Sequence, residues 1–173
     1  MDSPVTYLTT PQFLNMPFWE RALHQAASQV GVREVPKGSN WGPKVSLYLK
    51  AAGFLTPAAW CAAFVTWCLR AVGVDRKSLP ALAASTYYWM DWARKKGRHR
   101  TAPKRGMLFV WNVKGAGHIG FVTNVSESGQ TFETIEGNTN SDGSREGYEV
   151  ARRTRTVKEI ADRGGFFIDL TGI

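Results

Sequence analysis

Cysteine is scarce in this sequence, with two among 173 residues, and the scarcity excludes two kinds of small domain. Two thiols cannot form a disulfide framework, and they are too few for a zinc site built from thiolates. Nor do we expect Cys61 and Cys68 to pair, because they lie seven residues apart on one predicted helix. A helix rises about 10 Å over that length, whereas the Cα atoms of a disulfide lie within about 7 Å. We therefore expect two free thiols, of which Cys68 is a small core residue.

Long apolar stretches are absent as well. No run approaches the ~20 residues of a transmembrane helix, and residues 1–6 lack the basic start and apolar segment of a secretory signal. We expect a protein that is made in the cytoplasm without a signal peptide and leaves only by lysis or dedicated export. Repeats, low-complexity tracts and linkers are also missing, which predicts a lead-in at residues 1–16 and a single domain over 17–173.

Acidic residues are outnumbered, with 14 against 22 basic ones, and the formal net charge is +8. The excess is concentrated in residues 94–96, 98–100, 104–105 and 152–155. Such a balance indicates a polyanionic partner, which could be nucleic acid, anionic lipid or an anionic cell-wall polymer. The alternative is a solvated basic surface without a partner. No RNP pattern or zinc finger is present, so we do not expect a nucleic acid.

The sequence does contain a clear change of pattern near Pro103. Apolar spacing predicts four helices before this point, at residues 19–30, 43–52, 60–72 and 85–96. Five short strands are predicted after it, at residues 107–111, 119–125, 131–136, 148–154 and 166–170. Helices followed by strands indicate an α+β domain, with N-terminal helices packed on a C-terminal antiparallel sheet. Trp89 and Trp92 are expected in its core.

The helix that starts near Trp60 places Cys61 in its first turn and stops at Gly73. Unpaired N–H groups and the positive end of the helix dipole favour a thiolate there, and a thiolate is the nucleophilic form of cysteine. A nucleophile of this kind requires a base. His24, on a polar helix face, and His99, in a basic stretch, are expected at the surface.

A candidate base occurs in Gly117-His118-Ile119-Gly120, ahead of a predicted strand. Residues 126–130 are typical of a hairpin loop that joins this strand to the next one. If Val125 pairs with Thr131, the numbers of paired residues sum to 256 throughout the hairpin.

In that register His118 faces Asn138, and Gly120 faces Glu136. Side chains alternate along a strand, so His118, Glu136 and Asn138 would project from one face. Gly120 has no side chain, which leaves room for Glu136 to reach the imidazole. Either Glu136 or Asn138 would then orient His118.

Each of these residues also has a purely structural interpretation. Cys61 would be an inert core thiol, and His118 an ordinary turn residue. Glu136 would lie on a strand surface, and Asn138 would form a turn. A cysteine–histidine pair is weak evidence by itself, and its strength here comes from the helix start and the two polar residues on the same strand face.

Three segments together resemble the CHAP family of cysteine, histidine-dependent amidohydrolases/peptidases. They are Trp60-Cys61-Ala62-Ala63-Phe64-Val65, Gly117-His118-Ile119-Gly120-Phe121-Val122 and Glu136-Gly137-Asn138-Thr139. Residues 31–43 resemble the lead-in of many bacterial and phage members, and the likeness covers roughly residues 20–170. The resemblance implies a papain-like α+β fold that cleaves amide bonds in peptidoglycan. It assigns Cys61 as nucleophile, His118 as base, and Glu136 and Asn138 as the supporting polar residues.

Two departures from the family pattern matter. Some phage members carry an aspartate-rich calcium loop ahead of the cysteine, but residues 55–59 contain no carboxylate, so we expect no metal and no cofactor. No separate wall-binding domain is evident either. The +8 charge would then attach the domain to an anionic wall polymer or membrane surface, and we expect a monomer.

The leading hypothesis is a peptidoglycan hydrolase that works through a cysteine thioester. It would be an N-acetylmuramoyl-L-alanine amidase or a stem-peptide endopeptidase, acting in the periplasm or cell wall as a phage endolysin or an antibacterial effector. One alternative is a non-enzymatic module that binds cell wall or nucleic acid, with a structural Cys61. The other is an acyltransferase that uses the same thioester.

Overall fold

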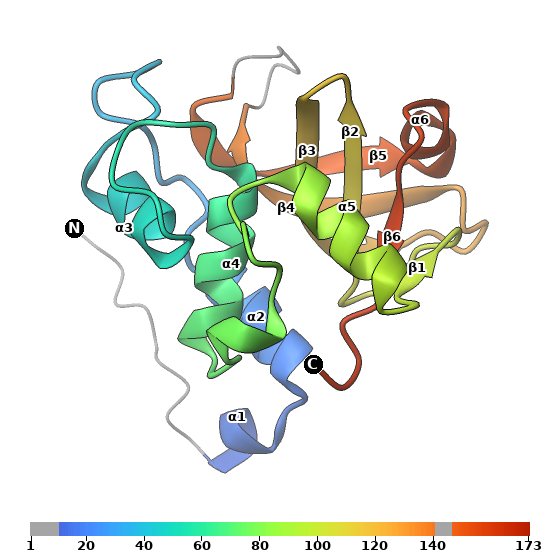
Figure 1. Ribbon diagram of the computed structural model, residues 1–173. Coiled ribbons are helices and arrows are strands. Elements are labelled where there is room, and N and C mark those ends of the chain that lie inside the picture. The colour runs from blue at the N-terminus through green and yellow to red at the C-terminus, as the bar shows by residue number, and fades with distance from the viewer. Residues whose placement is uncertain (1–10, 141–146) are drawn as a thin grey trace.

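The computed structural model of the protein describes residues 11–140 and 147–173 (Figure 1). The helices are α1 (Pro11–Asn15), α2 (Phe18–Ala27), α3 (Pro43–Ala51), α4 (Cys61–Ala71), the 3₁₀ turn η1 (Arg76–Ser78), α5 (Thr86–Lys95) and α6 (Val157–Asp162). The strands are β1 (His99–Arg100), β2 (Leu108–Val113), β3 (Ala116–Val125), β4 (Thr131–Thr139), β5 (Glu149–Thr156) and β6 (Phe166–Ile168). No helix in the described ranges has both the length and the apolar character needed to cross a bilayer.

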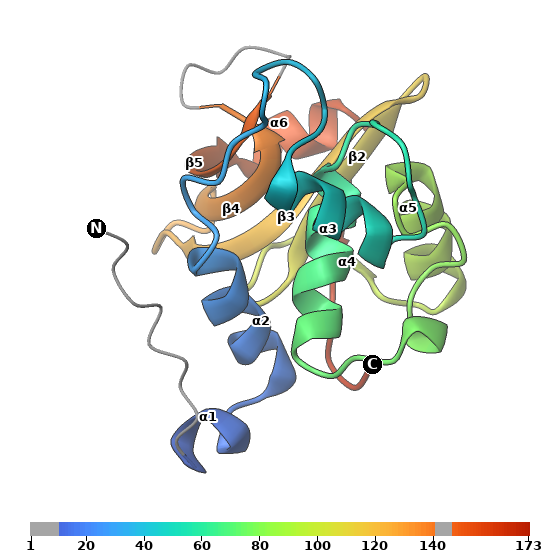
Figure 2. The same cartoon turned by 90° about the vertical axis from the view of Figure 1, so that its left-hand side faces the viewer.

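The six strands form one antiparallel sheet in the order β1-β6-β2-β3-β4-β5. Helices α2, α4 and α5 pack against β2, β3 and β4, whereas the short α6 contacts β2 and β5 (Figures 1 and 2). Strand alternation therefore gives the sheet two apolar faces. Ile119 and Phe121 belong to the large cluster shared with the helices, and Phe109 and Phe132 belong to a smaller cluster shared with α6. The predicted α+β class is confirmed.

Helix α4 is the centre of the larger cluster. Most of its residues are buried, as expected for a helix that is apolar on nearly all sides. Phe64 meets the ring of Phe121 on β3 and that of Tyr48 on α3. Cys61 and Cys68 are free thiols, as predicted, and burial raises the pKa of the Cys68 thiol well above its usual value. The helix that carries Cys61 is thus embedded in the core.

The helix predictions near the site hold to within a residue or two, but those at the edges of the fold do not. The helix predicted at residues 19–30 ends at Ala27, and part of the lead-in forms α1. Helix α6 was not predicted, although Thr156 and Glu159 form a capping box at its start. Strand β3 begins at Ala116, so His118 lies within the strand rather than in a turn before it. Trp89 is fully buried as predicted, and Trp92 is partly buried against the core.

Candidate active site

Cys61 is the first residue of α4, and its side chain is almost completely buried. Trp60 occupies the N-cap position with φ −120°, and no side chain caps the first turn. The first N–H groups of α4 are therefore not occupied by a capping side chain. The Trp60 indole donates a 2.8 Å hydrogen bond to the buried carboxylate of Glu34, which fixes the residue that precedes the thiol.

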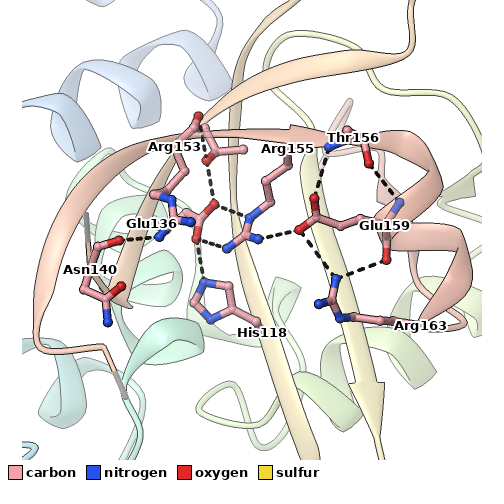
Figure 3. A network of polar contacts seen from close by, with 9 residues as sticks. His118, Glu136, Asn140, Arg153, Arg155, Thr156, Glu159 and Arg163 are labelled. Carbon is pink, nitrogen blue, oxygen red and sulfur yellow. Dashed lines mark hydrogen bonds and ion pairs between the residues drawn. The ribbon is translucent and has the colours of Figure 1, made fainter. Parts of the chain in front are cut away.

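His118 on β3 connects two side chains from distant parts of the sequence. Its Nε2 lies 2.7 Å from Oε2 of Glu136 on β4 (Figure 3). The imidazole also interacts with the side chain of Cys61. Only 13% of the His118 side chain is exposed. Burial alone would lower the pKa of His118, but the bonds with Cys61 and Glu136 outweigh it and raise the pKa to about 9. The imidazole is therefore stabilised in its protonated form.

Glu136 is fully buried and has every carboxylate oxygen engaged. Its Oε1 accepts hydrogen bonds from Thr134 Oγ1 (2.6 Å) and Arg155 Nε (2.6 Å), and its Oε2 accepts from Arg155 Nη2 (2.7 Å). Burial favours the neutral acid, but the bonds from Arg155 and His118 hold the pKa of Glu136 far below its usual range. Glu136 thus remains ionised beside the imidazole.

The predicted register of β3 and β4 is correct near the site and wrong near the loop that joins the two strands. Phe121 pairs with Ile135 and Val122 with Thr134, as predicted. Val125, however, pairs with Phe132 rather than with Thr131, because a β-bulge between Val122 and Asn124 inserts one residue into β3. The sequence pattern carries no clear signal for this bulge.

Gly120 makes the contact between Glu136 and the imidazole possible. A Cβ atom at this position would lie 2.9 Å from Glu136 Cγ and 2.8 Å from the Phe109 ring. The prediction that Gly120 leaves room for Glu136 is confirmed.

Asn138 does not join the imidazole, contrary to the prediction that it projects beside His118. Its backbone adopts a left-handed conformation (φ 54°), and the β4–β5 pairing is irregular between Glu136 and Thr139. With its amide oriented so that donors meet acceptors, Asn138 donates to the Gly147 carbonyl (2.7 Å) and accepts from the Trp60 N–H (3.3 Å). Glu136 is therefore the residue that contacts His118, and Asn138 contacts the start of α4.

Arg155 and Thr134 belong to the site but were not predicted as site residues. Arg155 was assigned to a basic surface stretch, yet only 12% of its side chain is exposed, and it pairs with both Glu136 and Glu159 (Figure 3). Strand alternation separates it from its exposed neighbours, and the capping box after it marks the end of β5. Both patterns were present in the sequence.

The remaining histidines are surface residues, as predicted. His24 on α2 and His99 on β1 are both exposed. Within residues 11–140 and 147–173 there is no group of three or more histidine, cysteine, aspartate or glutamate side chains that could hold a metal ion.

Comparison with known proteins supports the family resemblance. The family model described as "CHAP domain" matches residues 53–138, a range that contains Cys61, His118, Glu136 and Asn138. No curated protein and no solved structure matches the chain.

Proposed function

We propose that this chain, which carries a CHAP domain, is a cysteine- and histidine-dependent hydrolase that cleaves an amide bond of peptidoglycan through a cysteine thioester. The bond is either the N-acetylmuramoyl–L-alanine amide or a peptide bond of the stem. We assign Cys61 as nucleophile, His118 as general base and acid, Glu136 as the residue that orients the imidazole, and Asn138 as support for the start of α4.

The observation that carries this proposal is the position of one imidazole between a thiol and a buried carboxylate. His118 Nε2 lies 2.7 Å from the Glu136 carboxylate, and the Cys61 side chain is close enough to the imidazole to raise the pKa of His118. A nucleophile, a base within reach of it, and a third group that orients the base are the parts of thiol acyl-transfer chemistry. The structural interpretations of Cys61 and Glu136 provide no reason for such an arrangement.

The reaction proceeds in two balanced steps. The Cys61 thiolate, paired with protonated His118, attacks the amide carbon, and the C–N bond breaks as His118 gives its proton to the leaving amine. Water then adds to the thioester while His118 takes one of its protons, and the carboxylic acid leaves as the sulfur is released. The uncapped N–H groups at the start of α4 are suited to stabilise the tetrahedral oxyanion in both steps.

The setting of this activity is also part of the proposal. We propose a monomer without a cofactor, released by lysis or dedicated export, that acts in the periplasm or cell wall as a phage endolysin or antibacterial effector. The net charge of +8 supports attachment to an anionic wall polymer or membrane surface.

Turbidity loss of purified cell walls tests the enzyme assignment. Wild type and Cys68→Ala are expected to clear the walls at similar rates, whereas Cys61→Ala is expected to lose nearly all activity. The two thiols are both buried on α4, which makes Cys68→Ala a matched control for the fold. Equal clearing by Cys61→Ala and Cys68→Ala would overturn the assignment of Cys61 as nucleophile. Binding without clearing by the wild type would favour the non-enzymatic module.

Mass spectrometry of the products separates hydrolysis from transfer and identifies the bond. Hydrolysis exposes a new carboxyl and a new amino group, whereas an acyltransferase joins the acyl part to a second amine. Products with a newly formed amide and no free carboxyl group would replace the hydrolase by the acyltransferase.

A further inference from the structure

Trp111 on β2 lies directly beside the imidazole of the proposed site. It pairs with His118 across the β2–β3 ladder, and the two ring centroids are 5.4 Å apart. Its indole is partly exposed, and two guanidinium groups lie over it, Arg155 at 5.0 Å and Arg163 at 4.9 Å. One aromatic ring thus links His118 to two cations.

The two arginines differ in how many of their N–H donors are already used in hydrogen bonds within the protein. Arg155 uses Nε and Nη2 on Glu136 and Nη1 on Glu159, and only 12% of its side chain is exposed. Arg163 follows α6 and is 45% exposed. Its Nη1 makes long contacts with the carbonyl (3.3 Å) and Oε1 (3.5 Å) of Glu159, and its Nε and Nη2 contact no partner among the described residues (Figure 3).

Glu159 does not neutralise Arg163 fully, because the same oxygen is held more tightly by Arg155. Glu159 Oε1 lies 2.6 Å from Arg155 Nη1 and 3.5 Å from Arg163 Nη1. Arg163 is the exposed cation of a group that also contains Arg155, Glu136 and Glu159. An anion at this place would meet an available guanidinium, which binds carboxylates through two parallel hydrogen bonds.

The chemistry of the proposed reaction fixes which part of a substrate lies there. His118 must deliver its proton to the leaving nitrogen, so the amine side of the scissile amide lies at the imidazole. Trp111 adjoins the imidazole, and Arg163 lies over Trp111. Groups that extend from the leaving amine are therefore the ones that can reach this pair.

We propose that Trp111 and Arg163 form a subsite for a carboxylate on the amine side of the scissile bond. The indole supports the backbone next to the leaving nitrogen, and the guanidinium of Arg163 binds the free carboxylate of that residue or of the one after it. The inference rests on the proposed hydrolase function, and it names a feature of the substrate. Stem peptides with free carboxylates are the preferred substrates, and their carboxamide forms are poor ones.

Binding to an inactive variant tests the subsite without requiring hydrolysis. The probes are soluble stem-peptide wall fragments with free carboxylates and the same fragments after conversion of the carboxylates to carboxamides. Titration calorimetry of Cys61→Ala is expected to show about tenfold tighter binding of the carboxylate form, which corresponds to one charged hydrogen-bonded contact at a partly exposed site. Adding Arg163→Gln should reduce the preference to about twofold, and Arg163→Lys should retain part of it.

Lys158→Gln is the matched control, because Lys158 is an exposed cation on α6 with an i,i+4 partner, Asp162. It should leave the preference unchanged. Retention of the preference by Arg163→Gln, its loss in Lys158→Gln, equal weakening of both probes, or no binding of either probe would each overturn the subsite. A carboxylate preference that depends on Arg163 in a protein that never cleaves walls would leave the subsite standing and remove the hydrolase function.

A kinetic readout distinguishes substrate binding from a merely structural role of Arg163. If the protein hydrolyses the carboxylate fragment, Arg163→Gln is expected to raise KM about tenfold and to leave kcat nearly unchanged, since the contact is made equally before and during the reaction. A fall in kcat on both probes, accompanied by a lower melting temperature, would assign Arg163 to the packing of α6 instead.

Discussion

Two basic stretches of the chain, residues 98–105 and 152–155, have similar composition but differ in how far their arginine side chains are buried. In the first, Arg100, Lys104 and Arg105 line a groove of about 370 Å³ together with Trp19 and Asp169. Their ion pairs are exposed, with 44% of the Arg100 side chain and 47% of the Arg105 side chain accessible. In the second stretch, Arg152 is exposed, whereas Arg155 lies inside the proposed site.

The difference follows from the backbone and not from the charges. Residues 152–155 lie on β5, where successive side chains point to opposite faces, so one basic run is divided between solvent and interior. Exposed ion pairs contribute little to stability, because water and salt screen them. A buried charge must be paired, and removing its partner costs about 3–5 kcal/mol. The two stretches should therefore respond very differently to the same substitution.

The largest effect is expected from Arg155→Met. The change removes both hydrogen bonds from Arg155 to Glu136. Among the described residues, that buried carboxylate then keeps His118 as its only cationic partner. We expect a loss of about 3–5 kcal/mol in the free energy of unfolding, measured by urea denaturation at pH 7. Wall hydrolysis should fall at least 100-fold, because the carboxylate that orients His118 loses its support.

Arg152→Met is the matched control for this experiment, since Arg152 belongs to the same strand and the same basic run but is exposed. It should change the unfolding free energy by less than about 0.5 kcal/mol. Similar losses of unfolding free energy in Arg155→Met and Arg152→Met would show that strand alternation does not give the two arginines different roles.

A smaller effect, visible in the pH dependence, is expected from Glu136→Gln. His118 has a pKa of about 9, above the 6.5 of an unperturbed imidazole, and the bond and charge of Glu136 contribute to the rise. Because the folded pKa is raised, the stability that protonated His118 provides is complete below about pH 6.5 and is lost as the pH rises through about 9. In Glu136→Gln the imidazole pKa should fall, which moves the alkaline limb of activity to lower pH.

NMR titration of the His118 ring measures that pKa directly. The alkaline limb of the pH–rate profile should report the same pKa during catalysis. Glu133→Gln serves as the control, because Glu133 is an exposed carboxylate on the same strand. An unchanged His118 titration in Glu136→Gln would show that Glu136 does not control the imidazole.

The site residues that could be predicted from the sequence are those whose positions follow from the periodicity of a single helix or hairpin. Cys61 was found from the apolar spacing of one helix and its glycine stop, and Glu136 from the alternation of a hairpin. Arg155 was missed because its role depends on the pairing of β5 with β4, and composition alone placed it at the surface. Asn138 was misplaced because its left-handed backbone turns its amide toward α4, a conformation that strand periodicity cannot predict.

The smallest effect is expected in the exposed groove, from the double change Lys104→Gln and Arg105→Gln. Arg105 pairs with Glu20 at 3.0 Å and Lys104 is exposed, so the fold should tolerate the loss of both charges. If the groove steers the protein to an anionic wall polymer, wall binding should weaken about threefold at low salt and much less at high salt. Hydrolysis of soluble fragments should stay unchanged, because neither residue contacts the proposed site. A sedimentation assay with cell walls across a salt series measures the effect. Equal binding of the variant and the wild type at low salt would show that this basic stretch is solvated surface, unlike the buried Arg155.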